Sequence, residues 1–376
     1  MALGRRLILV FNVGSSTLKY ALFAAHGDPG DIARGSVEYS STADSASAAD
    51  KVLDDLTSKS QLAEIVAVGH RLVHGGIHLC EPVVIDPSVR QELRALISLA
   101  PDHLPLELQA VDAVSKRLPH AVQVACFDTA FHSQMPRHAR LFGIPRKLSD
   151  AGVLRYGFHG LSYEYIVATL RDSGRLPRRA VVAHMGNGAS ITAILDGVSI
   201  DTSMGMTPTG GMVMSTRSGD LDPGAVLFMM RALGFSVSDL ENAVDKEGGL
   251  LGISEYSSDV RTLLSARATM PKAADAIDAF CYQARKFIGA YAAALGGLDL
   301  IVFTGGVGEH SAEIRSQICS GLEFVGVEIE DSRNRQNAET ISPDRSRVRV
   351  AVMTTNEEKM IARHVQRVTA QASTAR

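Results

Sequence analysis

Two arginines stand in segments where a guanidinium group could bind an anion. Arg71 lies in 69–76, which reads Gly-His-Arg-Leu-Val-His-Gly-Gly and follows the apolar run 65–68. Arg217 lies in a segment of the same character, 216–220. Because the guanidinium fork matches carboxylate and phosphoryl groups, two such arginines could hold an acid and a migrating phosphoryl group. The alternative is a structural arginine paired with a carboxylate.

Carboxylates and a histidine are further candidates for the same site. Asp128 follows the predicted strand 121–126, and side chains at strand ends face ligand crevices in α/β sheets. His159 lies between two glycines, and a structural role for it stays open. The sequence has no HExxH motif and no clustered Cys and His, which argues against a transition-metal site. Mg²⁺ needs one or two carboxylates, and the candidates are Asp128, Asp220, Glu357 and Glu358.

Three glycine-rich segments could bring backbone N–H groups to a nucleotide. The turn 12–17, which includes Ser15 and Ser16, could wrap a phosphate, with Lys19 just beyond it. The segment 186–188 could hold another phosphate, and 306–309 could approach a nucleoside. For the first two, an ordinary hairpin turn is the alternative.

The elements around these segments predict an α/β fold. Apolar runs at 7–11 and 18–23 flank the first turn, and runs at 180–184 and 191–195 flank the second. Two such hairpins, about half a chain apart, suggest a duplicated fold. The run 300–303 predicts a buried strand, followed by a glycine turn and a helix over 311–322 with Ser311 as its N-cap. Strands that alternate with helices indicate the α/β class.

Other segments predict helices or exposed chain. The segment 37–59 is rich in Ser, Ala and Asp and is expected to face solvent. The helix predicted over 273–295 is apolar all round, so we expect it to be buried. The remaining predicted helices span 88–99, 106–117, 163–171 and 223–233.

Composition limits the classes of function. The 376 residues suggest two or three domains at ~150 residues each. With 38 basic and 41 acidic residues the net charge is −3, which argues against a nucleic-acid partner. The four cysteines are far apart in the sequence and fit reduced thiols in a cytoplasmic protein. The apolar run 7–11 is shorter than the ~7–15 residues of a signal-peptide core, and we expect neither a membrane span nor a membrane partner.

Taken together, these motifs resemble the acetate/propionate kinase family of the actin–hexokinase–sugar kinase superfamily. The matching motifs run from Asn12 to Glu358, and therefore over nearly the whole chain. They include FNVGSSTLKY at 11–20, GHRLVHGG at 69–76, CFDTAFH at 126–132, RYGFHGLS at 155–162, AHMGNGASITAI at 183–194, DTSMGMTP at 201–208, TRSGDLDPG at 216–224, SSDVR at 257–261, FTGGVGEHS at 303–311 and TNEEKMIAR at 355–363.

The resemblance implies an architecture and an assembly. Family members have two similar α/β domains of the ribonuclease-H-like or actin-like ATPase fold, with a nucleotide cleft between them. The N-terminal domain would comprise 1–132 plus 359–376, and the C-terminal, nucleotide-binding domain 133–358. The family's partners are a small carboxylate and ATP or ADP, its cofactor is Mg²⁺ or Mn²⁺, and its members are homodimers.

The resemblance also implies roles at single positions. Asn12 and Glu357 would organise the metal ion. Arg71 and Arg217 would hold the carboxylate and phosphoryl groups, with Asp128 as the active-site carboxylate and His159 stabilising the transferred group. Val73, Phe158 and Pro208 would line a pocket for the substrate methyl group. ATP would be bound by Lys19, His184, Met185, Gly186, Asn187, Gly188, Asp259, Val260, Arg261, Gly306, Val307, Gly308, Glu309 and His310.

The implied activity is reversible transfer of the γ-phosphoryl group of Mg-ATP to acetate, giving acetyl phosphate and ADP. The acid is already ionised at neutral pH, so no general base is needed and Asp128 would position groups. The alternatives are propionate or another short acid as acceptor, another donor such as pyrophosphate, a sugar kinase, and, from another class, a non-catalytic ATP-binding switch.

One departure from the family bears on the acceptor. The segment 100–105 reads Ala-Pro-Asp-His-Leu-Pro, so Asp102 stands where a leucine usually lines the methyl pocket. Because a buried, unpaired carboxylate is costly, Asp102 must point away or pair with His103 or Arg71. The preference among acyl chains therefore stays open.

Overall fold

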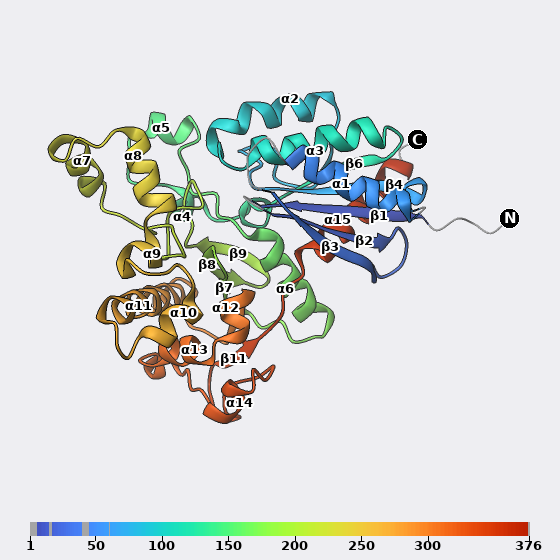
Figure 1. The fold of residues 1–376 in the computed structure, drawn as a ribbon. Coiled ribbons are helices and arrows are strands. Elements are labelled where there is room, and N and C mark those ends of the chain that lie inside the picture. The colour runs from blue at the N-terminus through green and yellow to red at the C-terminus, as the bar shows by residue number, and fades with distance from the viewer. Residues whose placement is uncertain (1–5, 15–16, 40–44, 60, 375–376) are drawn as a thin grey trace. The chain divides into compact units, whose positions relative to one another are not determined.

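The computed structural model describes residues 6–14, 17–39, 45–59 and 61–374 (Figure 1). The chain forms two compact units. Unit 1 comprises Met1–Ser133, Gly160–Tyr165 and Asn356–Arg376, and unit 2 comprises Gln134–His159 and Ile166–Thr355. Residues 356–358, expected with the second domain, thus group with unit 1. Within the described ranges, no helix is both long and apolar enough to cross a membrane.

Unit 1 is built on a six-stranded mixed sheet. Its central strand β1 pairs antiparallel with β2 and parallel with β4, and β4 continues parallel to β6. Parallel neighbours place the carboxyl ends of β1, β4 and β6 at one edge of the sheet. In order across the sheet the strands are β3 (Asp31–Glu38), β2 (Thr17–Ala24), β1 (Leu7–Val13), β4 (Ile65–Leu72), β6 (Val122–Phe127) and β5 (Val83–Val84).

Unit 2 repeats this arrangement. Its central strand β7 pairs antiparallel with β8, which pairs antiparallel with β9, and β7 lies parallel to β10, which lies parallel to β11. The five strands therefore match β3-β2-β1-β4-β6 in order and direction. The predicted duplication and the α/β class are confirmed. The strands are β9 (Val198–Thr202), β8 (Ala189–Leu195), β7 (Arg179–Met185), β10 (Leu300–Thr304) and β11 (Arg349–Val352).

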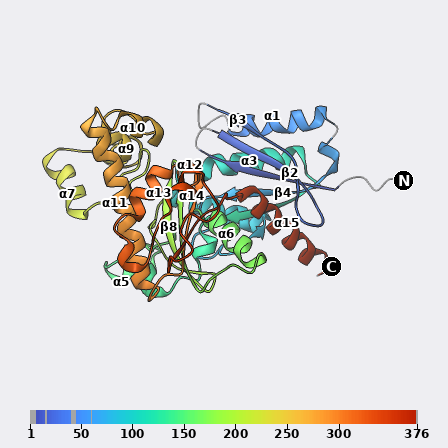
Figure 2. The ribbon, with the colours of Figure 1, turned by 90° about the horizontal axis from the view of Figure 1, so that it is seen from below.

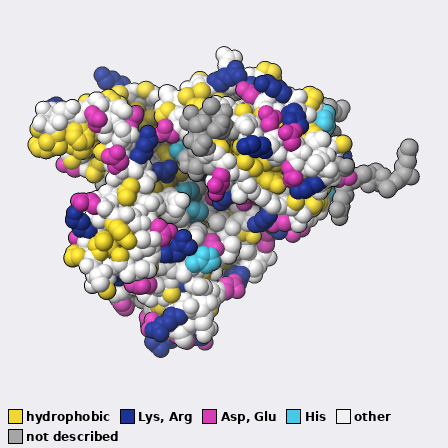
Figure 3. Space-filling view, viewed as in Figure 1, with side chains coloured by type: hydrophobic (Ala, Val, Ile, Leu, Met, Phe, Trp, Pro, Cys, Tyr) yellow, Lys and Arg dark blue, Asp and Glu magenta, His cyan; other side chains and the backbone are white. Residues whose placement is uncertain are grey.

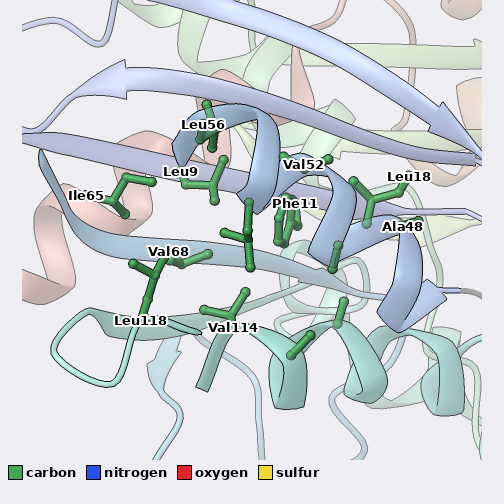
Figure 4. Close-up of a cluster of buried hydrophobic side chains, with 14 of the residues drawn as sticks. Leu9, Phe11, Leu18, Ala48, Val52, Leu56, Ile65, Val68, Val114 and Leu118 are labelled. Carbon is green, nitrogen blue, oxygen red and sulfur yellow. The ribbon is translucent and has the colours of Figure 1, made fainter. Parts of the chain in front are cut away.

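Helices cover both faces of the unit 1 sheet. On one face α1 (Ser45–Ser58) and α3 (Leu104–Arg117) bury side chains such as Leu53 and Val114 against the strands (Figure 4). On the other face α15 (Glu357–Thr374) packs through Ile361 and Val365, and Figure 2 shows it in red below the sheet. The C-terminal helix thus returns to the first sheet.

The segment 37–59 corrects one prediction. Of its described residues, the last of β3 and all of α1 belong to this layered structure. Val52, Leu53 and Leu56 are buried with Ala48 and Ala49. Four-residue spacing gives α1 an apolar stripe, which the high content of Ser, Ala and Asp concealed.

The long helix of unit 2 is a second correction. α11 (Pro271–Ala294) buries one face, including Ile277, Phe280 and Ile288, whereas Tyr282 on the same helix is 59% exposed. The remaining helical segments are η1 (Leu62–Glu64), α2 (Pro87–Ala95), η2 (Leu96–Leu99), η3 (Ala130–His132), α4 (Arg137–Arg140), α5 (Arg146–Asp150), α6 (Gly160–Asp172), α7 (Pro223–Ala232), α8 (Val237–Glu241), the π-helical η4 (Asn242–Lys246), α9 (Gly249–Ser254), α10 (Val260–Ala266), α12 (Gly305–His310), α13 (Ala312–Cys319), η5 (Glu323–Val325) and α14 (Asp331–Arg335).

Candidate active site

In unit 1, Arg71 and Asp128 form a two-pronged ion pair. Arg71 lies near the end of β4, and Asp128 directly follows the neighbouring strand β6. The Nε of Arg71 donates to Oδ1 of Asp128 over 3.1 Å, and its Nη2 donates to Oδ2. Burial raises the pKa of Asp128 to about 6, against the opposing effect of Arg71, so this carboxylate is ionised at neutral pH. Both predicted site residues are therefore brought together.

Asn12 connects this pair to the first turn of α15. Its Nδ2 donates to Oε2 of Glu357 over 3.2 Å and to Oε1 of Glu358 over 2.9 Å, and its Oδ1 accepts from Arg71 over 3.4 Å. Two carboxylates and an amide oxygen supply the hard oxygen donors that Mg²⁺ prefers, so this donor set fits the ion. Among the residues described, no group of three or more His, Cys, Asp or Glu has the geometry to hold a metal by itself.

Glu107 is a buried carboxyl that the sequence analysis missed. It lies in the first turn of α3, is 1% exposed, and accepts a hydrogen bond on Oε2 from the backbone N–H of Val73 over 3.0 Å. Burial raises the pKa of Glu107 to about 8, although Arg71 and the N–H of Val73 act in the opposite direction. The sequence did contain a signal for this burial. Glu107 shares the helical spacing i, i+3, i+4, i+7 with the apolar residues Leu104, Leu108 and Val111, and would therefore lie on their buried face.

Asp102 lies away from the interior. It is exposed in the loop before α3, and this resolves the question its sequence position raised. The buried carboxyl in this part of unit 1 is Glu107, five positions further along the chain. The acidic residue that enters the interior is therefore a different one from Asp102.

In unit 2, His159 is held in an uncommon backbone conformation. Its φ of 58° lies in the left-handed region, which costs a non-glycine residue of the order of 1–2 kcal/mol. The residue precedes α6, and its Nδ1 lies 2.9 Å from Oγ of Ser190 on β8. The ring of His159 also stacks on that of His184, at the end of β7. Three segments thus fix one imidazole.

Gly188 marks the point where His159 and Arg217 converge. A methyl group built on Gly188 would lie 3.2 Å from Nε2 of His159 and 3.5 Å from Nη1 of Arg217. Nη1 of Arg217 also donates to the backbone oxygen of Pro208 over 3.4 Å. Two predicted site residues of unit 2, His159 and Arg217, therefore lie side by side at one glycine, whose lack of a side chain keeps it from crowding them.

The predicted glycine turn after β10 is instead a helix, α12. Gly305 has a φ of 77°, and a Cβ there would lie 2.7 Å from the backbone oxygen of Met185, so only glycine fits. Glu309 bends back, and its Oε1 accepts from the N–H of Gly305 over 2.9 Å. Gly306 and His310 are exposed on the same helix. The motif therefore presents small and polar groups at the end of β10, and its contact with a nucleoside stays a prediction.

The second predicted adenosine segment shows a capping role. Asp259 accepts on Oδ1 from the N–H of Thr262 over 2.9 Å and caps α10, and this backbone hydrogen bond lowers the pKa of Asp259. Val260 is buried, and the side chain of Arg261 is 91% exposed. Arg261 therefore extends into solvent.

The other predicted positions lie in different settings. Lys19 is exposed on β2, opposite Asn12 in the register of the sheet. Phe158 and Val73 are buried. Asp220, a candidate for a metal ion, instead accepts on Oδ1 from the N–H of Gly211 over 2.7 Å. Ser15 and Ser16, in the predicted phosphate turn, lie outside the described residues.

These features define a class of protein. A duplicated sheet of this order, with an arginine–carboxylate pair in one unit and a histidine–arginine cluster in the other, is typical of enzymes that transfer a phosphoryl group. The model of the acetokinase family matches residues 34–363. The chain belongs to the acetokinase family, which confirms the resemblance drawn from its motifs.

Individual relatives agree. An acetate kinase of Methylocella silvestris is 48% identical over 80% of this chain and 75% of its own, and one of Phocaeicola vulgatus is 44% identical over 94% and 97%. Among solved structures, the acetate kinase of Porphyromonas gingivalis is 37% identical, with a TM-score of 0.88 over 97% of this chain and 100% of its own. A propionate kinase of Francisella tularensis is 35% identical, with a TM-score of 0.90 over 96% and 100%.

Proposed function

We propose that this chain is a phosphotransferase with a carboxyl group as acceptor, and that it phosphorylates acetate reversibly with Mg-ATP. The family match and the acetate kinases among its relatives support this activity over a non-catalytic ATP-binding switch. The observation that carries the proposal is the convergence of His159 and Arg217 on Gly188. Two nitrogen donors that lie side by side suit a phosphoryl group in transit, whose charge is spread over its equatorial oxygens.

Arg71 would bind the anionic end of the acid in unit 1. Its charge is oriented by Asp128, and burial of this pair in a region of low dielectric strengthens its interaction with an anion. The acid attacks as a carboxylate, so no proton has to be removed and Asp128 acts by positioning Arg71. Val73 would contact the acyl group.

His159 and Arg217 would stabilise the phosphoryl group as it moves. Nδ1 of His159 lies 2.9 Å from Oγ of Ser190, and its Nε2 lies on the side of Gly188, where it would face the transferred group. Preorganised donors of this kind cost no reorganisation during the reaction, and removing one typically costs about 10²–10³ in kcat.

ATP would be bound in unit 2 by the segments at the ends of β7 and β10. There His184–Gly188 and Gly306–His310 would contact the nucleotide, with Asp259, Val260 and Arg261. Asn12 and Glu357, with Glu358 beside them, would hold Mg²⁺. When bound, the ion neutralises charge on the β- and γ-phosphates, and Mn²⁺ would serve the same purpose.

Propionate is the second acceptor to consider. The solved propionate kinase of Francisella tularensis has a TM-score as high as that of the acetate kinases, so the fold accommodates both activities. The test is acyl-phosphate formation from Mg-ATP with acetate, propionate and butyrate, trapped as hydroxamate, beside a blank without acid. Acid-dependent product is expected. ATP consumption at the same rate with and without acid would contradict the proposal.

We also propose that the chain is a cytoplasmic homodimer that pairs through the surface around α7. The exposed apolar side chains there are Leu221, Leu227, Phe228, Met230, Leu233 and Val237, and they form the yellow patch at the left of Figure 3. Contiguous apolar surface of this kind marks an association site. Phe228→Glu should yield monomers in light scattering, whereas Phe324→Glu, at a phenylalanine elsewhere that is even more exposed, should not. A monomeric parent protein would refute the proposal.

A further inference from the structure

Glu107 is a carboxyl group on an otherwise apolar face of α3. Leu104, Leu108 and Val111 share its face of the helix and are buried, as Glu107 is. Arg71 and Asp128 both act on it electrostatically. Its hydrogen bond with the N–H of Val73, two residues after Arg71, places the side chain at the acceptor side of unit 1.

Only one of its two oxygens has a protein partner. Oε2 accepts from the N–H of Val73, whereas Oε1 is buried and makes no hydrogen bond within the described residues. Because Oε2 accepts from the backbone N–H of Val73, the proton of the neutral group resides on Oε1, and burial favours this neutral form by raising the pKa of Glu107 to about 8. The site thus contains a buried O–H donor, directed by a bond to the residue that would border the acyl group.

We infer that Glu107 determines acceptor specificity, and that its Oε1 hydrogen-bonds a hydroxyl group on the carbon next to the carboxylate, so that short 2-hydroxy acids are substrates as well as acetate. This inference rests on the proposed function. A hydroxyl group satisfies the buried donor, whereas a methyl group in the same place leaves it unsatisfied. A site built to bond a hydroxyl rejects the analogue that lacks it far more strongly than an apolar pocket rejects one methylene.

Glycolate and propionate form a matched pair for the test, because they differ only by a hydroxyl in place of a methyl group. The readout is the ratio of kcat/KM for glycolate to kcat/KM for propionate, with acetate measured alongside in every preparation. In the parent protein we expect a ratio above one. Glu107→Leu should lower it at least tenfold, mainly through a higher KM for glycolate.

Two further variants separate specificity from structure. Glu107→Gln keeps the shape and a donor, so the ratio should stay within about threefold of the parent. Asp102→Leu, at the exposed acidic residue of the preceding loop, should leave the ratio unchanged.

Three outcomes would overturn the inference. They are a ratio below one in the parent protein, a ratio that Glu107→Leu does not change, and a glycolate complex in which Oε1 bonds only a buried water. If Glu107→Leu does not fold, the parent ratio and Glu107→Gln still decide the question. Absence of acetate phosphorylation would instead refute the proposed function itself, so the two failures are distinguishable.

Discussion

The imidazole rings of His159 and His184 stack with their centroids 4.3 Å apart and their planes inclined by 24°. His184 ends a central strand, and His159 precedes a helix in the left-handed conformation. The stack, with the Ser190 hydrogen bond, fixes the side of the His159 ring that faces Gly188. Strain held in place by several contacts is a property of functional sites.

Gly188→Ala tests whether the space beside Gly188 matters. The added methyl group would lie 3.2 Å from Nε2 of His159, so the imidazole ring must shift away from it. We expect kcat to fall at least tenfold, since displacements of about 1 Å cost about 10² in rate, with the melting temperature nearly unchanged. Steady-state kinetics and calorimetry measure both. Gly143→Ala, where nothing lies within 4 Å, is the control, and full activity in Gly188→Ala would refute the role of this space.

Arg217→Ala separates transition-state stabilisation from nucleotide binding. We expect kcat to fall by about 10²–10³ while the KM for ATP changes little, because the guanidinium group would act on charge in transit. Initial rates over a matrix of ATP and acetate concentrations check this. Arg178→Ala removes an exposed arginine near Asp196 and should change neither constant. An unchanged kcat in Arg217→Ala would eliminate the proposed role.

Asp128→Asn tests the ion pair with Arg71. Asp128 is 1% exposed, so its loss leaves a buried guanidinium group without its charged partner. We expect a lower free energy of unfolding, by about 3–5 kcal/mol, together with a large loss of activity. Urea titration measures the first. The double variant Arg71→Met/Asp128→Leu should recover much of the stability and none of the activity, and additive losses would argue against a coupled pair.

Glu107→Gln should change how stability depends on pH. The pKa of Glu107 is about 8 in the folded protein and 4.5 at its ordinary value. As pH rises from about 4.5 to 8, the unfolded chain releases this proton first, so the contribution of Glu107 to stability is lost across that interval. The free energy of unfolding of the variant, minus that of the parent protein, should therefore rise by roughly 2–4 kcal/mol from pH 5 to pH 8, at about 1.4 kcal/mol per pH unit. Urea titrations of both proteins at pH 5 and pH 8 measure these free energies. The same difference between variant and parent at both pH values would contradict the prediction.

Motifs and local patterns were sufficient for the class, the duplication and the family. Two hairpins were predicted, one around residues 12–17 and one around 186–188. Each depends on an apolar run, a turn and a second apolar run, and these signals lie within a few positions of one another. The N-cap of α13 was also predicted, since Ser311 accepts from the N–H of Ile314. Such features are decided by neighbours along the chain.

The sequence by itself determined which residues could do chemistry; only the tertiary structure decided which carboxyl is buried and which side chains meet. Asp102 and Glu107 are acidic residues on either side of the start of one helix, yet Asp102 is exposed and Glu107 is buried against the backbone of Val73. Likewise, the convergence of His159 and Arg217 beside Gly188 joins positions far apart in the chain. Burial and contact depend on strands pairing over long sequence separations, and single-sequence periodicity carries no information about those pairings.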